Sequence, residues 1–337
     1  MNVPGLDLTR LAGYVSEAAP GLLEAPLSAE VIAGGKSNLT YLVRGGRAAV
    51  LRRPPLGHVL PTAHDMAREY RVIAALYPTG FPVPEPLHLC QDTDVIGVPF
   101  YLMSFVDGIV LRDKADIDGL APDAARRAGE LLADTLAALH AKDPAAVGLG
   151  DFGRPVGYLE RQVRRWHEQW RRSQTRELPA LEDVAARLAA GVPADGRATI
   201  VHGDFRLDNV MVDGDVRRIL AVLDWEMATL GDPLADVGLL VVYTQLAADG
   251  LAPTTPRFGP AQGFLSASEL VDRYAAATGA SVSNIGWYVA LGYYKLAIIS
   301  EGIHARYLQG KTVGAGFERM GSAVPLLIER AAAALEG

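Results

Sequence analysis

A short segment of the chain concentrates the side chains that could carry out chemistry. His202, Asp204 and Asn209 follow one apolar run in the spacing H-x-D-x-x-x-x-N, and Asp224 ends the next apolar run. Phosphoryl transfer from Mg·ATP requires a carboxylate that accepts the proton of the attacking hydroxyl, together with oxygen ligands for Mg²⁺. Asp204 suits the first task, and Asn209 and Asp224 offer the hard oxygen donors that Mg²⁺ prefers. The spacing therefore predicts a phosphotransferase site with Asp204 as its base.

Two short strands are expected to position these residues. Residues 199–201 and 218–223 are apolar runs that each end in an acidic segment, which is typical of short buried strands. His202 is expected to hold the loop by hydrogen bonds to the backbone rather than to act on the substrate. Asp232 and Asp236 are interpreted in the same way, as residues that hold a loop rather than a metal ion.

The first part of the chain has a strand pattern. Between residues 27 and 105, the runs 39–44 and 47–52 are separated by two glycines, a loop length typical of tight hairpins. Apolar residues at helical spacing predict one helix over residues 62–77. The proline-rich residues 78–86 cannot continue that helix and lead into another predicted strand pair, which ends at residues 101–103.

The rest of the chain has a helical pattern. Helices are predicted over residues 123–140 and 157–172, and most of the last third of the chain also has helical spacing. The patterns therefore predict an α+β protein with a small β-rich lobe at residues 1–105 and a larger helical lobe at residues 106–337.

The composition is that of an ordinary folded protein. The 337 residues are 50% hydrophobic and 21% charged, so the chain can bury a core. A net charge of −7 provides no general attraction to nucleic acid or anionic lipid, and we expect neither as a partner.

The most apolar stretch, residues 285–300, is shorter than the ~20 residues of a membrane-spanning helix and contains Lys295. Cys90 is the single cysteine and no basic leader begins the sequence, which predicts a cytoplasmic protein.

Taken together and in order, several segments resemble the aminoglycoside phosphotransferase family of kinase-like enzymes. The resemblance covers nearly the whole chain and is strongest to the branch that occurs fused to some acyl-CoA dehydrogenases. The segments that carry it are residues 34–41 (GGKSNLTY), 50–55 (VLRRPP), 68–70 (REY), 202–209 (HGDFRLDN), 223–226 (LDWE) and 231–236 (GDPLAD).

The resemblance implies a protein-kinase-like fold of two lobes with ATP bound between them. It implies that Asp204 is the catalytic base and that Asn209 and Asp224 bind Mg²⁺. It also implies that the adenine lies against residues 103–105, which makes Met103 and Phe105 nucleotide-binding candidates.

Two segments depart from the protein-kinase pattern. Arg52 stands where protein kinases have the lysine of Val-Ala-Ile-Lys, and its guanidinium could clamp phosphate oxygens while it pairs with Glu69 of the next helix. Arg53 lies on the opposite face of the same strand, so Arg52 is preferred. The expected phosphate-binding loop lacks the G-x-G-x-x-G pattern; its small residues could still admit phosphates to the backbone. The candidate residues of this loop are Gly34, Gly35, Ser37 and Asn38.

These observations favour a phosphotransferase that acts on a hydroxyl of a small molecule. An aminoglycoside is polycationic, whereas residues 232–337 contain nine acidic and seven basic residues and the helix before them is rich in arginine. A hydroxylated metabolite, acidic or linked to acyl-CoA, fits the arginines of residues 154–176 and Arg306 better, although those arginines also suit a solvated helix face. Two alternatives stay open, a true aminoglycoside phosphotransferase and a non-catalytic ATP-binding module. A protein kinase is disfavoured because no Ala-Pro-Glu segment follows Asp224.

Overall fold

The computed structural model describes residues 3–32, 38–56, 64–194, 196–251, 257–311 and 317–337. These residues form two units, of which the first comprises Met1–Gly108 and Leu220–Ala228 and the second comprises Ile109–Ile219 and Thr229–Gly337. The first unit contains an antiparallel sheet and the second is mainly helical, which confirms the predicted α+β class.

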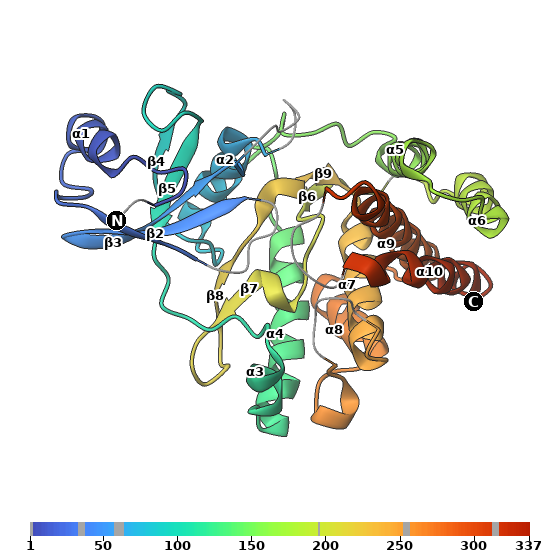
Figure 1. Cartoon of the computed structure of the whole chain (residues 1–337). Helices are drawn as coiled ribbons and strands as arrows, with labels where there is room; N and C mark the ends of the chain where they lie inside the picture. The colour runs from blue at the N-terminus through green and yellow to red at the C-terminus, as the bar shows by residue number, and fades with distance from the viewer. Residues whose placement is uncertain (1–2, 33–37, 57–63, 195, 252–256, 312–316) are drawn as a thin grey trace. The chain divides into compact units, whose positions relative to one another are not determined.

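The first unit is built on a five-stranded antiparallel sheet in the order β1-β2-β3-β5-β4 (Figure 1). The predicted hairpin joins β2 to β3, and Gly46 makes the turn with φ 74°, a conformation that favours glycine. The strands are β1 (Ser28–Val31), β2 (Leu39–Gly45), β3 (Arg47–Arg53), β4 (Pro86–Cys90) and β5 (Phe100–Ser104).

Two helices accompany this sheet. Helix α1 (Leu8–Ala18) buries Leu11 and Val15 in the same apolar cluster as alternate residues of β2, β3 and β5. Helix α2 (Met66–Leu76) contacts β4 and β5. It begins later than the predicted residues 62–77 because Asp65 caps it, accepting a hydrogen bond from the Arg68 backbone at 3.0 Å. Residues 62 and 63 lie outside the described residues.

The segment Leu220–Ala228 belongs to this first unit although it is distant in the sequence. The backbone amide of Val222 donates to the carbonyl of Pro82 at 2.8 Å, and the ring of Trp225 packs edge-on against Phe81. Asp224 is thereby held in the same unit as the five-stranded sheet.

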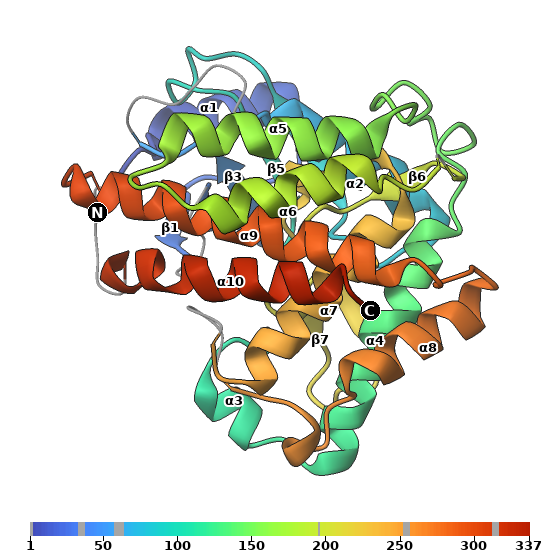
Figure 2. The ribbon, with the colours of Figure 1, turned by 90° about the vertical axis from the view of Figure 1, so that its right-hand side faces the viewer.

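The second unit is formed mainly by helices. Helices α5, α6, α9 and α10 lie side by side (Figure 2). Helices α4 and α5 reproduce the predicted ranges to within one residue at each end. The helices are α3 (Lys114–Asp118), α4 (Pro122–His140), α5 (Tyr158–Ser173), α6 (Pro179–Ala190), α7 (Pro233–Ala248), α8 (Ala267–Thr278), α9 (Ile285–Leu308) and α10 (Met320–Ala334).

Short strands and turns surround the predicted catalytic segment. β6 (Thr199–Val201) pairs antiparallel with β9 (Thr229–Gly231), and the 3-10 turn Leu207–Asn209 leads into β7 (Val210–Val212). A turn then joins β7 to β8 (Ile219–Val222), the strand in which the chain passes from the second unit to the first. The two strand predictions around this segment are thus confirmed.

Helices α7 and α9 form the buried centre of the second unit. Both are apolar on most of their circumference, as expected for helices that are covered on all sides. Gly238 of α7 permits their close approach, because a Cβ at this position would lie 2.6 Å from the backbone of Tyr288. Among the described residues, no helix is both long and apolar enough to cross a membrane.

Candidate functional site

In the first unit, Arg52 is held among acidic side chains. Its Nε atom lies 2.8 Å from Glu69 Oε2, and its Nη2 atom donates to Asp224 Oδ1 at 2.5 Å. Glu69 is buried and also accepts hydrogen bonds from Tyr101 at 3.0 Å and from Asn38 at 2.8 Å. The strand, the helix and the segment that carries Asp224 therefore meet at one guanidinium.

The opposite charges of Arg52 and its carboxylate neighbours stabilise one another's ionised forms. Burial opposes the charge on Arg52, but Tyr101, Glu69 and Asp224 outweigh it and raise the pKa of the guanidinium. Burial raises the pKa of Glu69, and the positive charge of Arg52 offsets part of that effect. Arg52 is therefore a permanent cation beside two carboxylates.

The neighbouring Arg53 has a different role. Successive strand residues point to opposite faces, and Arg53 donates to the backbone carbonyls of Gly5 and Pro54. The structure thus places Arg52, and not Arg53, beside Glu69 and Asp224, as the sequence alternation predicts.

Asp224 has an unusual backbone conformation. Its φ and ψ of 64° and 61° are left-handed, a region that non-glycine residues adopt at a cost. The buried Trp225 follows and fixes the turn by donating from Nε1 to the carbonyl of Val222 at 3.0 Å. The carboxylate of Asp224 stays 30% exposed, so it is accessible to a ligand while Arg52 holds one of its oxygens.

The other nucleotide-binding candidates of this unit differ in accessibility. Gly34, Gly35 and Ser37 lie outside the described residues. Asn38 is buried, and its amide group contacts Glu69, Glu226 and His64. Met103 is buried in β5, whereas Phe105 just beyond the strand is exposed. The roles assigned to these residues in nucleotide binding stay predictions.

In the second unit, Asp236 fixes the backbone at the start of the predicted catalytic loop. Its carboxylate accepts from the amides of His202 at 2.6 Å and Gly203 at 2.7 Å, and it lies 3.3 Å from His140 Nε2. Burial opposes its ionisation, but these hydrogen bonds and the nearby histidines together lower the pKa of Asp236. The buried carboxylate therefore joins α7 to the loop.

The structural roles predicted for His202 and Asp232 agree with their contacts. His202 is fully buried, and its Nδ1 atom lies 3.2 Å from the amide of Asp204, placed to accept its hydrogen bond. Asp232 caps α7 by accepting from the amide of Leu234 at 2.9 Å, and it also accepts from the Tyr288 hydroxyl.

Asp204 and Asn209 form a hydrogen-bonded pair within this loop. The Asn209 amide donates from Nδ2 to the backbone carbonyl of Asp204 at 2.8 Å and to its Oδ2 atom at 3.1 Å. Arg206 lies nearby, with Nη2 3.1 Å from Asp208 and Nε 3.7 Å from Asp204 Oδ2. The carboxylate of Asp204 is thus presented by a loop whose backbone and side chains are fixed.

Two residues near Asp204 were not predicted from the sequence. Tyr243 of α7 donates from its hydroxyl to Asp204 Oδ1, and Lys295 of α9 donates to the carbonyl of Gly203 at 2.6 Å. Burial lowers the pKa of Lys295, which also lies over the ring of Trp166. The sequence carried a signal for Lys295, because it is the one charged residue in the apolar stretch 285–300. It carried none for Tyr243, which neighbours other polar residues of α7.

The arginine-rich helix α5 uses several of its cations for local contacts. Arg161 donates to the carbonyls of Arg154 and Val156, which precede the helix, and Arg172 pairs with Glu168. Arg176, beyond the helix, pairs at 2.8 Å with the fully buried Glu301.

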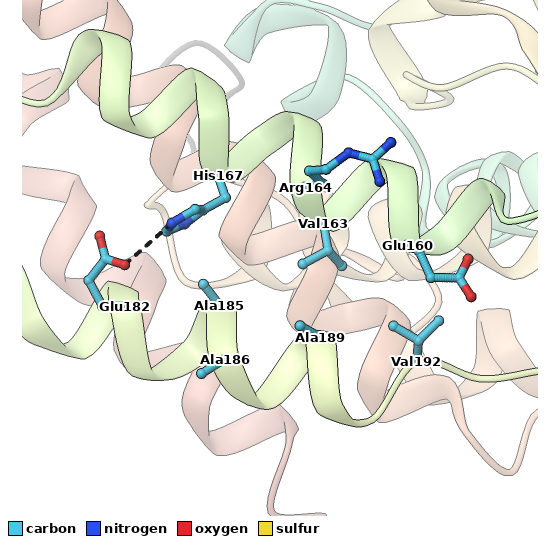
Figure 3. Close-up of a pocket in the computed structure, with 9 residues that line it drawn as sticks. All are labelled: Glu160, Val163, Arg164, His167, Glu182, Ala185, Ala186, Ala189 and Val192. Carbon is cyan, nitrogen blue, oxygen red and sulfur yellow. Dashed lines mark ion pairs between the residues drawn. The ribbon is translucent and has the colours of Figure 1, made fainter.

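A hollow of about 340 Å³ lies between α5 and α6, with small alanines of α6 on its floor (Figure 3). His167 of α5 points across it to Glu182 of α6, at 3.5 Å, and Arg164 lies at its rim. Arg306 is exposed near the end of α9.

Each unit contains one side chain with an oxygen that could bind Mg²⁺, Asp224 in the first unit and Asn209 in the second. Asn209 commits its amide nitrogen to Asp204, so the oxygen of that amide is the end left for a cation. Asp224 supplies a partly exposed carboxylate. No group of three or more His, Cys, Asp and Glu side chains in the described part of the chain could hold a metal ion. Mg²⁺ sites in proteins usually combine one or two carboxylates with waters and substrate phosphates.

Comparison with known proteins identifies related sequences. A family model described as the phosphotransferase enzyme family (APH) matches residues 28–276. Acyl-CoA dehydrogenase family member 11 of Gallus gallus is 39% identical over 335 residues, which cover 96% of this chain and 43% of that protein. Member 10 of Mus musculus is 36% identical over 301 residues, which cover 88% of this chain and 28% of that protein. The chain thus spans less than half the length of these curated relatives.

Solved structures show the same fold. A Ralstonia eutropha JMP134 protein, provisionally described as an aminoglycoside phosphotransferase, is 32% identical with a TM-score of 0.85 over 98% of both chains. The GDP complex of aminoglycoside 2'-phosphotransferase-IIIa has a TM-score of 0.61 at 17% identity, covering 97% of this chain and 99% of that one. A mutant of APH(4)-Ia with AMP-PNP and hygromycin B has a TM-score of 0.60 at 16% identity, covering 97% and 98%. These likenesses confirm the predicted kinase-like fold. The acyl-CoA dehydrogenase family members among the curated relatives confirm the predicted branch.

Proposed function

The chain belongs to the phosphotransferase enzyme family, and from that premise we propose that it transfers the γ-phosphoryl group of Mg·ATP to a hydroxyl of a small molecule. The observation that carries the proposal is the loop of residues 202–209, in which Asp204 is held by Asn209 on a backbone that Asp236 fixes. Phosphoryl transfer depends mainly on positioning and charge neutralisation, so a rigidly held carboxylate is the feature it needs.

Asp204 acts as the base in this proposal. The acceptor oxygen forms a bond to the γ-phosphorus while the bond from that phosphorus to the β–γ bridging oxygen breaks. The proton of the acceptor hydroxyl passes to the carboxylate of Asp204, and ADP leaves with the electrons of the broken bond.

The first unit holds the nucleotide in this proposal. Arg52, oriented by Glu69, pairs with phosphate oxygens through its planar guanidinium. Asn209 and Asp224 are the proposed ligands of Mg²⁺. When bound, the ion neutralises charge on the phosphates.

The proposed acceptor is a hydroxylated metabolite, acidic or linked to acyl-CoA. The near balance of charge in residues 232–337 and the basic character of α5 are unfavourable for a polycation. The curated relatives are named as acyl-CoA dehydrogenase family members, which supports an acyl-CoA-linked hydroxy acid. We further propose that the protein is cytoplasmic, which its single, buried cysteine suits.

Release of ADP tests the proposal. Mg·ATP is supplied with a panel of hydroxyacyl-CoAs, hydroxy acids, choline-like amines and aminoglycosides, and Mg·GTP is run in parallel. We expect turnover with one acceptor class and a loss of roughly 10²-fold or more in Asp204→Ala, because the general base is removed. The matched control is Asp215→Ala, which removes an exposed carboxylate of the turn before β8.

Each outcome has a distinct meaning. Phosphorylation of cationic sugars alone would make the chain an aminoglycoside phosphotransferase. Nucleotide binding without turnover on any acceptor would favour a non-catalytic ATP-binding module. Equal loss in Asp204→Ala and Asp215→Ala would contradict the role of Asp204.

A further inference from the structure

Tyr243 contacts the proposed base from α7. Its hydroxyl donates to Asp204 Oδ1, and its ring lies 5.1 Å from the guanidinium of Arg206. Tyr243 is partly buried, and its hydroxyl provides one hydrogen bond to Asp204 Oδ1, so removal of the hydroxyl would take this donor from the carboxylate.

The two oxygens of Asp204 are contacted by different elements. Tyr243 of α7 donates to Oδ1, and Asn209 of the loop donates to Oδ2 at 3.1 Å. A carboxylate that accepts one hydrogen bond at each oxygen cannot rotate freely. Its plane is therefore fixed by two donors, while the remaining lone pairs stay available to an incoming hydroxyl.

We propose that Tyr243 is a positioning residue, whose hydroxyl holds the Asp204 carboxylate in the orientation that is needed to accept a proton from the acceptor hydroxyl. The inference rests on the proposed role of Asp204 as base. Burial, together with the charge of Asp204, raises the pKa of Tyr243 well above its ordinary value. Tyr243 therefore stays protonated and serves as a donor, which leaves Asp204 as the base.

Other charged groups in this unit also act on the pair. Arg206 and Asp208 lie in the same loop, and Lys295 approaches from α9. A test must therefore leave these groups in place. Tyr243→Phe does so, because it removes only the hydroxyl and keeps the ring against which Arg206 lies.

A kinetic test compares Tyr243→Phe with Tyr293→Phe. The control also loses one hydroxyl, in this case one that donates to Gln245 at 2.7 Å. For Tyr243→Phe we expect kcat to fall roughly tenfold or more, while the KM for ATP stays unchanged. An unchanged kcat in Tyr243→Phe, or an equal fall in Tyr293→Phe, would overturn the proposal.

A spectroscopic test works without an acceptor. Aspartate is labelled with ¹³C at the carboxyl carbon, and the Asp204 resonance is assigned by its absence in Asp204→Ala. At one fixed, neutral pH we expect the chemical shift of this resonance to change in Tyr243→Phe and to stay at its wild-type value in Tyr293→Phe. Identical shifts in all three proteins would show that the Tyr243 hydroxyl does not hold the carboxylate, and would overturn the proposal even if the chain proved to be an active phosphotransferase.

A further measurement does not need the Tyr243→Phe variant and therefore applies even if that variant fails to fold. Tyrosine is labelled with ¹³C at Cζ, and spectra of the wild type and Asp204→Ala are compared. We expect one tyrosine resonance to shift when the carboxylate is removed. The absence of any shift would contradict the hydrogen bond. A shift of the tyrosine resonance together with no turnover on any acceptor would confirm the hydrogen bond but contradict the proposed phosphotransferase activity.

Discussion

Arg52 is the residue on which the acidic side chains of the first unit converge. It contacts Glu69 at 2.8 Å and Asp224 at 2.5 Å. Glu69 lies on the helix that follows β3, whereas Asp224 lies far along the chain, directly after β8. A guanidinium can serve both partners at once because its donors form a rigid planar fork. A lysine at this position would offer a single point charge on a flexible stem.

The substitutions Arg52→Lys and Arg53→Lys test this difference at adjacent positions. For Arg52→Lys we expect kcat/KM to fall roughly tenfold or more, because the two-sided contact is lost although the charge is kept. Arg53→Lys should leave nucleotide affinity unchanged, since Arg53 lies on the opposite face of β3 and donates to the backbone carbonyls of Gly5 and Pro54. Titration with Mg·ATP and steady-state kinetics measure both effects. Equal losses in the two variants would contradict the assignment of Arg52.

At the scale of elements, Asp236 is the residue that joins α7 to the loop after β6. Its carboxylate accepts two loop amides and lies beside His140 of α4, so three elements depend on one buried negative charge. Breaking such a group leaves buried donors without a partner, which is more unfavourable than the loss of an exposed contact.

Asp236→Asn should therefore lower the free energy of unfolding by about 3 kcal/mol at neutral pH. The pKa of Asp236 is lowered on folding, so its stabilisation is complete above the ordinary value of 3.8 and is lost as the pH falls through the lower folded value. The difference in unfolding free energy between wild type and variant should thus shrink below pH 3.8. Urea denaturation over a range of pH measures it.

Asp232→Asn is the matched control for this substitution. Asp232 caps the same helix, and asparagine is an equally good N-cap residue, so we expect a change within about 0.5 kcal/mol. A destabilisation as large as that of Asp236→Asn would mean that any charge removed near the start of α7 has the same effect.

For the whole molecule, nucleotide binding should appear as added stability. A ligand that binds only the folded chain, at about 100 times its Kd, adds about 2.7 kcal/mol. We expect Mg·ATP to raise the unfolding midpoint more than ATP without Mg²⁺ does. In Asp224→Ala that increment from Mg²⁺ should disappear, whereas in Asp215→Ala it should persist. Differential scanning fluorimetry measures the midpoints, and an increment retained in Asp224→Ala would contradict the role of Asp224 as a metal ligand.

The sequence by itself determined the features that depend on local patterns. Helix-forming composition and helix boundary signals located α4 and α5 to within one residue at each end, and the paired glycines located the β2–β3 hairpin. Alternation along β3 distinguished Arg52 from Arg53, because neighbouring strand residues point to opposite faces. The ordered motifs also identified the family, since Asp204, Asn209 and Asp224 occur in a fixed sequence of spacings.

Only the tertiary structure decided which side chains support those residues. Tyr243 and Lys295 reach the loop of residues 202–209 from helices α7 and α9, whose apolar sequences predict burial but not a partner. Leu220–Ala228 packs in the first unit although it is far from the sheet in sequence. Local propensity carries no information on contacts between distant segments, because these are set by how whole helices and strands pack.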